Sequence, residues 1–137
     1  MEDFMSPVGY SFCISLLLRV PWRGFLFMAP VCSSWVWVSR SVTRRCAAWP
    51  CGRSSICSVR TGNKMLSRCI LLIMLAVCKG LAWALEQPLS SLAPEYWRLQ
   101  ELLAWLLPKG CYRGVVHLED YGAGSRKPLQ SFPELSL

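Results

Sequence analysis

A chain of 137 residues is long enough for one domain of modest size, and 53% of its residues are hydrophobic, which excludes disorder throughout. Its 15 lysines and arginines against 8 acidic residues give a formal net charge of +7, so polyanions such as nucleic acid, or anionic membrane surfaces, are the expected partners. The single histidine excludes a metal site built from several histidines, and we expect no metal site.

The first part of the chain reads as a helix followed by a strand. Residues 6–18 predict a short buried helix, and residues 32–38 predict a loop rich in Ser and Trp. Between them, residues 25–29 fit a short buried strand, because Gly24 and Pro30 leave too few residues for a helix.

A basic stretch follows. No acidic residue interrupts Arg40–Arg68, and residues 39–62 show no periodicity and contain Pro50 and Gly52. We therefore expect 39–62 to form a long basic loop that is open to disorder. Arg40–Arg68 is the predicted contact for DNA or another polyanion. Nearby tryptophans could stack on bases or simply pack in a core; these are Trp35, Trp37 and Trp49.

The middle of the chain predicts a second helix and strand. Asn63 is the expected N-cap of a helix that runs to Lys79, with Gly80 just past its end. Residues 81–85 fit a second buried strand. An alternative interpretation is a small membrane-associated protein that is anchored through residues 66–85.

The last part completes an α/β pattern. A helix is expected from Pro94, with strands over 115–118 and 129–132. The order of elements predicts one partial α/β domain over residues 1–137, with a small, partly parallel sheet and helices packed on it. Ligands of such sheets bind beyond the carboxyl ends of the strands.

The eight cysteines favour reduced thiols over a disulfide framework. Cys13, Cys69 and Cys78 lie in apolar runs, where a free cysteine behaves as a small hydrophobic residue. The spacing of the cysteines matches no common zinc site. Reduced thiols favour an intracellular location, although the sequence identifies no compartment.

Three short segments place reactive side chains after predicted strands. They are Ala29-Pro30-Val31-Cys32-Ser33-Ser34, then Leu85-Glu86-Gln87-Pro88, and then Asp120-Tyr121-Gly122-Ala123-Gly124-Ser125-Arg126-Lys127-Pro128. In this order they resemble the catalytic core of the cytosine-5 DNA methyltransferases over roughly residues 25–132. The resemblance implies a fragment of a Rossmann-like methyltransferase fold.

The resemblance also implies roles for three side chains. The Cys32 thiolate would add to C6 of cytosine, Glu86 would contact the edge of the base, and Arg126 would position the base or its backbone. A methyl group would come from S-adenosylmethionine, and the base would have to be flipped out of a duplex. Nearby guanidinium groups would lower the pKa of the thiol.

Departures from the family pattern limit what this chain can do alone. Val31 stands where a proline precedes the catalytic cysteine, and Gln87 replaces the usual asparagine. No glycine-rich cofactor loop precedes Cys32, so S-adenosylmethionine would bind only if a missing N-terminal half were supplied. We therefore expect an inactive or truncated DNA-methyltransferase-like domain that retains nucleic-acid contact and does not catalyse independently.

Simpler interpretations stay open at each position. Cys32 could be an ordinary thiol in a turn, Glu86 could cap the following turn, and Arg126 could belong to a solvated basic loop. A non-functional open reading frame is a further alternative, because the composition resembles translated GC-rich DNA.

Overall fold

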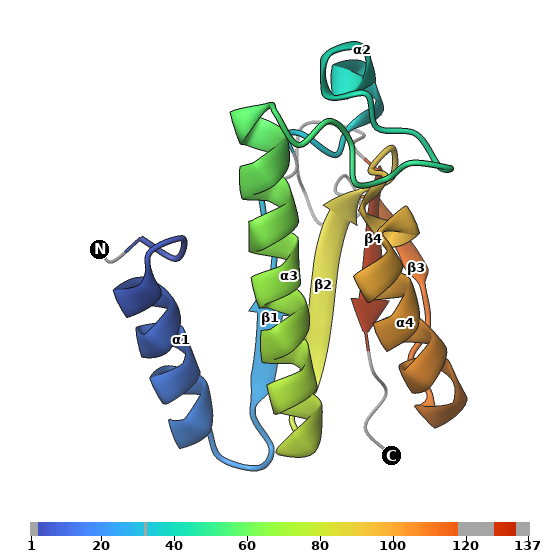
Figure 1. Cartoon of the computed structure of the whole chain (residues 1–137). Helices are drawn as coiled ribbons and strands as arrows, with labels where there is room; N and C mark the ends of the chain where they lie inside the picture. The colour runs from blue at the N-terminus through green and yellow to red at the C-terminus, as the bar shows by residue number, and fades with distance from the viewer. Residues whose placement is uncertain (1–2, 32, 118–127, 134–137) are drawn as a thin grey trace.

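Helices and strands alternate along the chain around a small mixed sheet. The computed structural model describes residues 3–31, 33–117 and 128–133 (Figure 1). The four strands among these residues are β1 (Phe25–Met28), β2 (Ala82–Pro88), β3 (Gly114–His117) and β4 (Pro128–Pro133).

The sheet is partly parallel, as predicted. Its strand order is β1-β2-β4-β3, with β1 parallel to β2 and β4 antiparallel to both of its neighbours. Strands β1, β2 and β3 therefore share one direction, and their carboxyl ends point toward the same end of the molecule (Figure 1). Because β4 lies between β2 and β3, those two strands are not neighbours.

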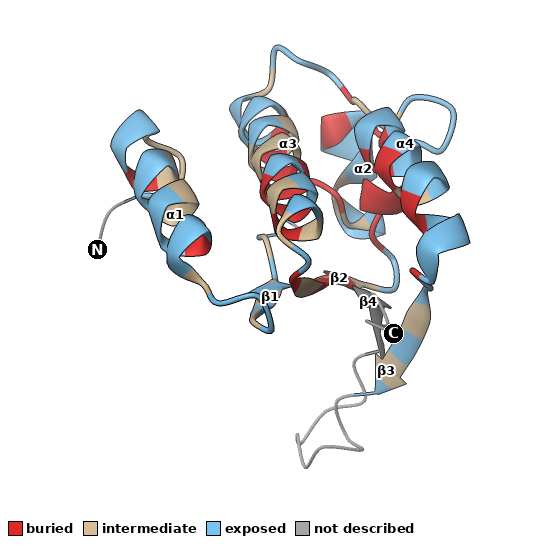
Figure 2. Cartoon of the chain, turned by 90° about the horizontal axis from the view of Figure 1, so that it is seen from below, coloured by how far each residue is buried: buried red, intermediate tan, exposed pale blue. Residues whose placement is uncertain are grey.

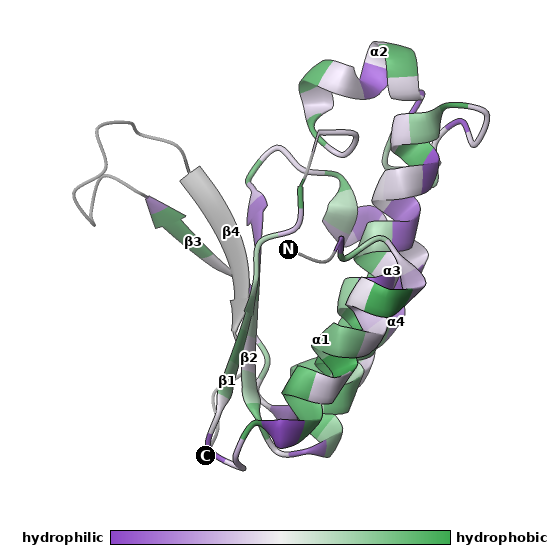
Figure 3. Ribbon diagram, turned by 90° about the vertical axis from the view of Figure 1, so that its left-hand side faces the viewer, coloured by the Kyte–Doolittle hydropathy of each residue, from purple (hydrophilic) through white to green (hydrophobic). Residues whose placement is uncertain are grey.

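Three helices lie over one face of the sheet: α1 (Pro7–Arg19), α3 (Cys57–Cys78) and α4 (Trp97–Leu106). Figure 2 and Figure 3 show that no described helix lies over the opposite face. The strand register explains which side chains meet the helices. Leu26 pairs with Trp83 and Met28 with Leu85, and all four belong to clusters packed under the helices.

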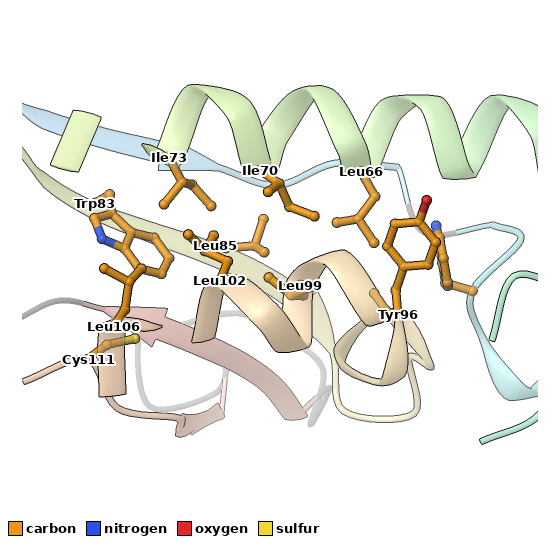
Figure 4. Packing of buried hydrophobic residues seen from close by; sticks show 12 residues of the cluster. Leu66, Ile70, Ile73, Trp83, Leu85, Tyr96, Leu99, Leu102, Leu106 and Cys111 are labelled. Carbon is orange, nitrogen blue, oxygen red and sulfur yellow. The ribbon is translucent and has the colours of Figure 1, made fainter. Parts of the chain in front are cut away.

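The main core lies between β2, α3 and α4 (Figure 4). Strand β2 contributes Trp83 and Leu85, helix α3 contributes Ile73, and helix α4 contributes Leu99 and Leu106, all of them fully buried. A smaller cluster around Leu17, Leu72, Ala76 and Leu81 joins α1 to α3 and to the start of β2.

Helix α3 differs from its prediction at one end. It begins at Cys57, six residues before the predicted cap Asn63, and its N-cap residue Ile56 makes no side-chain cap hydrogen bond. Its C-terminal end agrees with the prediction: Gly80 adopts a positive φ of 67°, and the Leu81 amide donates to the Ala76 carbonyl at 2.9 Å.

The expected loop over residues 39–62 contains more regular structure than predicted. It includes the short helix α2 (Arg40–Thr43), and its last six residues form the start of α3. Helix α4 begins at Trp97, after a 3-10 turn that contains Pro94, and therefore starts three residues later than predicted.

Helix α3 is also the described helix that bears on the alternative of a membrane anchor. By length and composition it could cross a bilayer, and 39% of its most apolar stretch is buried within the protein. Core helices of soluble proteins pass the same test, so this is weak evidence. Residues 66–85 do not form one helix: α3 ends at Cys78, the chain turns at Gly80, and β2 begins at Ala82.

Cationic side chains of α3 and of its C-cap residue Lys79 hold α1 in place. The Lys79 ammonium donates to the carbonyls of Leu17 and Val20 at 3.0 Å each, at the C-terminal end of α1. The Arg68 guanidinium donates to the Ser6 carbonyl at 3.1 Å, at the other end. The Lys79 contacts lie where the last carbonyls of a helix lack intrahelical partners, whereas the Ser6 carbonyl also accepts from the Tyr10 amide at 3.1 Å.

Candidate nucleic-acid interface

Of the three predicted catalytic residues, the structure places one. Cys32 and Arg126 lie outside the described residues. Glu86 lies within β2, where it pairs with Ser131 of β4, whereas the sequence predicted that it would follow the strand. Alternation along β2 puts Glu86 on the face opposite to Leu85 and the helices. Partial burial raises the pKa of the Glu86 carboxyl above its ordinary value.

The segments 29–34 and 85–88 nevertheless contact each other. The contact is made by Gln87, which stands out in the sequence only because it replaces the asparagine of the methyltransferase motif. Gln87 is fully buried, and its amide nitrogen donates to the Pro30 carbonyl at 3.2 Å. Its amide oxygen accepts a hydrogen bond from the Ser91 hydroxyl at 3.0 Å. Gln87 therefore links the exit of β1 to the turn after β2, and it has a structural role that an alternation pattern cannot reveal.

The chain after β1 folds over this end of the sheet. Val36 forms an isolated bridge with Ser91, and the Leu92 amide donates to the Trp35 carbonyl at 2.8 Å. Figure 1 shows α2 beyond the carboxyl ends of β1 and β2. The segment that leads into the basic stretch is thus anchored over the predicted ligand-binding edge.

A buried arginine organises this segment. Arg45 is 2% exposed, and its guanidinium carbon lies 3.5 Å from the centroid of the Trp35 ring. Its Nη2 donates to Asn63 Oδ1 at 2.8 Å, and the Asn63 amide nitrogen in turn donates to the Cys51 carbonyl at 3.0 Å. Burial lowers the pKa of Arg45 to about 10, so the side chain is still a cation at neutral pH.

The structure separates the tryptophans that the sequence grouped together. Trp35 is 2% exposed and packs in the core, whereas Trp37 is 51% and Trp49 is 62% exposed. The Arg40 guanidinium carbon lies 3.1 Å from the centroid of the Trp37 ring, and both residues are exposed. The Trp49 indole nitrogen donates to the Gly52 carbonyl at 3.3 Å, which orients its ring.

Exposed arginines complete the surface. Arg60 is held by hydrogen bonds from its Nη1 to the carbonyls of Ser54 and Ser55, at 3.0 and 3.1 Å. Arg44 and Arg53 are also exposed. We call this surface the basic cap, and its members are Trp37, Arg40, Arg44, Trp49, Arg53 and Arg60.

A hollow of about 310 Å³ lies beside the basic cap, at the start of α3. Four hydroxyl-bearing residues and the apolar residues Val31 and Met65 are among those that line it; the former are Ser33, Ser34, Ser58 and Thr61. No group of three or more His, Cys, Asp or Glu side chains that could hold a metal ion occurs among the described residues. The surface therefore offers aromatic rings, guanidinium groups and hydroxyls.

No protein family, curated protein or solved structure matches this sequence. The methyltransferase resemblance thus stays a prediction from short motifs. The chemistry of the basic cap has to be argued from its own side chains.

Proposed function

We propose that this protein binds single-stranded nucleic acid through the basic cap. The observation that carries the proposal is the stacked, exposed pair of Trp37 and Arg40. A flat ring backed by a guanidinium group is a platform on which an unstacked base can lie. Trp49 supplies a second exposed ring in the same segment.

The arginines of the cap would contact the phosphates. A guanidinium group binds phosphate oxygens in a bidentate manner, and Arg60 is already oriented by two backbone carbonyls. The neighbouring hydroxyls of Ser58 and Thr61 can donate further hydrogen bonds to the backbone. Such contacts give affinity and little sequence preference.

Single strands fit the cap better than duplexes do. Among the described residues, the cap consists of the four-residue helix α2, which is too short to fill a major groove, loop residues, a 3-10 turn with Trp37 and the first turn of α3 with Arg60. Exposed indole rings stack on bases that are already unpaired, and duplex bases are stacked on each other.

This contact is the part of the predicted methyltransferase-like function that needs no cofactor. The proposal therefore retains the expected nucleic-acid contact of an inactive or truncated domain, and it assigns no bond-making step to Cys32, Glu86 or Arg126. A Glu86 carboxyl with a raised pKa lies in β2, which ends beneath the cap, and it is not required for binding here.

The test compares two exposed tryptophans that each stack against a cation. Trp37→Ala removes the platform of the cap, and Trp105→Ala removes the matched ring on α4, where the Lys109 ammonium lies 3.4 Å from the ring centroid. Because stacking contributes about 1–3 kcal/mol per base, Trp37→Ala should weaken binding by roughly five- to a hundredfold. Fluorescence anisotropy with a labelled oligothymidylate measures the Kd.

The control is that Trp105→Ala leaves the affinity unchanged. Equal losses in both variants would mean that exposed indoles bind without regard to the cap, and the proposal would then be wrong. Binding of a duplex of the same length more tightly than the single strand would also contradict it.

A further inference from the structure

A second exposed surface lies along α1 and β1, away from the basic cap. Helix α1 presents Val8, Phe12 and Leu16 at a spacing of four residues, with exposed fractions of 65%, 54% and 48%. Residues four apart lie on one face of a helix, so these three form a stripe. The inner face of α1 packs on α3 through Leu17, and the stripe is therefore an additional apolar face.

The same apolar surface continues past the end of α1. Trp22, in the turn before β1, is 69% exposed, and Phe25 and Phe27 of β1 are each 60% exposed. A groove of about 390 Å³ lies between the helix and the edge strand β1; Leu16 of the stripe, Phe25 and Phe27 are among its lining residues, whereas Val8 and Phe12 are not. Alternation along β1 turns Phe25 and Phe27 away from the helices, so the apolar surface wraps around this edge of the sheet. Its wall is predominantly apolar. We call this surface the α1–β1 face.

Contiguous exposed apolar surface of this kind marks a docking site, and the surrounding charge indicates what docks. Arg19 and Arg23 are exposed next to Trp22, and the Arg23 guanidinium carbon lies 4.3 Å from the centroid of the Trp22 ring. No acidic residue occurs in the sequence between Asp3 and Glu86. The partner that docks on the α1–β1 face must therefore offer an apolar region to the exposed apolar side chains and anionic groups to Arg19 and Arg23.

We propose that the α1–β1 face docks on the surface of an anionic lipid bilayer. Tryptophan and arginine side chains suit the headgroup level, while the Phe12, Leu16 and Phe25 side chains can enter the acyl boundary. A second copy of the chain fits less well. A symmetric contact through this face would place Arg19 and Arg23 of both copies in one interface, with no acidic group between Asp3 and Glu86 to neutralise them.

The experiment is co-sedimentation of the full chain with two kinds of vesicle, phosphatidylcholine alone and phosphatidylcholine mixed with phosphatidylserine. We expect the chain to bind the vesicles that contain phosphatidylserine, and we expect this binding to weaken as salt is added. The double variant Phe12→Ser/Trp22→Ser should lower the partition coefficient about tenfold, because it removes exposed apolar area that would be buried in the bilayer. Circular dichroism checks that this surface variant is folded.

The matched control is Val38→Ser, which changes an apolar side chain that is 87% exposed beside α2. It should bind like the unchanged chain. Equal binding of the double variant, or loss of binding in Arg44→Ala/Arg53→Ala alone, would assign vesicle binding to the basic cap and overturn the proposal.

A dimer in sedimentation equilibrium that Trp22→Ser dissociates, with no vesicle binding, would make a second copy the occupant. Resistance of vesicle-bound chain to carbonate extraction would indicate a spanning segment, which also contradicts surface docking.

Discussion

Arg45 is a buried cation that donates its hydrogen bonds to uncharged oxygen atoms. Its guanidinium reaches the Pro50 carbonyl, the Ser34 hydroxyl, the Val59 carbonyl and the Asn63 amide. These partners belong to separate parts of the chain. One side chain therefore fixes the loop around Pro50 and the segment at Ser34 against the start of α3. Arginine suits this position because its planar fork directs several donors at once.

Removing this guanidinium should destabilise the fold. Arg45→Met keeps much of the apolar stem but leaves buried acceptors without a donor, which costs about 2–4 kcal/mol in the free energy of unfolding. Urea denaturation followed by circular dichroism measures the change. Arg53→Met, at an exposed position, should shift the free energy by less than about 0.5 kcal/mol. Similar effects of the two substitutions would show that the buried network contributes little.

Glu86 is expected to make the stability of the protein depend on pH. Desolvation raises the pKa of its carboxyl in the folded chain above the unfolded value, so ionisation opposes folding. The stability that the neutral carboxyl contributes is complete below the unfolded pKa and is lost as pH rises through the folded pKa.

Glu86→Gln should therefore stabilise the chain at pH 7 and have little effect at pH 4. Melting temperatures of both chains, measured across this range, give the difference directly. Glu101→Gln, at an exposed position of α4, is the matched control. A Glu86→Gln difference that is largest at acidic pH would reverse the sign and exclude desolvation as the cause.

At the scale of elements, helix α3 owes its position to a glycine in its interior. A Cβ added at Gly62 would lie 2.3 Å from the Ser34 hydroxyl oxygen and 3.1 Å from the Trp35 indole nitrogen. The close approach of Ser34 and Trp35 to α3 thus requires a residue without a side chain there.

Gly62→Ala should consequently lower stability, although alanine favours helices by about 1 kcal/mol over glycine. The neighbouring exposed substitution Thr61→Ala, which adds helix propensity without a clash, should leave the melting temperature unchanged or slightly raised. Thermal denaturation compares the two. A higher melting temperature for Gly62→Ala would mean that Ser34 and Trp35 move aside at little cost.

Single residues in the sequence predicted where helices and strands begin and end better than they predicted which residues these elements contact. Gly24 and Pro30 bracket β1, and Gly80 ends α3 through its positive φ, so both boundaries follow from single residues. Asn63 was predicted as a cap because it is a good capping residue, but the structure uses it to bind Arg45, eighteen residues earlier.

The candidate site was predictable only in part, for the same reason. The arginine-rich composition indicated a polyanion surface, but which tryptophan is buried depends on Arg45 and Tyr96, both of which pack against Trp35. The end of β2 was placed too early because its last residues pair with β4, a partner more than forty residues further along the chain. No local pattern contains that pairing.

For the whole molecule, net charge overstates the cationic surface. Arg45, Lys64, Arg68 and Lys79 are engaged with oxygen atoms of the protein itself. The basic cap offers Arg40, Arg44 and Arg53 to a ligand, together with the exposed Arg60, whose bonds to the Ser54 and Ser55 carbonyls both come from Nη1. The number of released counterions should follow this second group and not the formal charge of +7.

Binding of single-stranded DNA should accordingly show a slope of about −3 in log Kobs against log salt, since each neutralised phosphate contributes about −0.7. A salt titration of the anisotropy assay gives the slope. Arg44→Ala/Arg53→Ala should reduce its magnitude by about half, whereas Arg98→Ala on α4 should leave it unchanged. A slope unaffected by the double substitution would place the phosphates elsewhere.

The position of β4 has a consequence for how the chain is made. Strand β4 is the last of the described strands to be synthesised, yet it lies inside the sheet, between β2 and β3. On a ribosome, β1 and β2 can pair early, but β3 has no neighbour until residues 128–133 emerge from the exit tunnel. Until then, one long edge of β2 is exposed to any other extended chain, so the nascent protein would depend on rapid completion or on a chaperone to avoid aggregation.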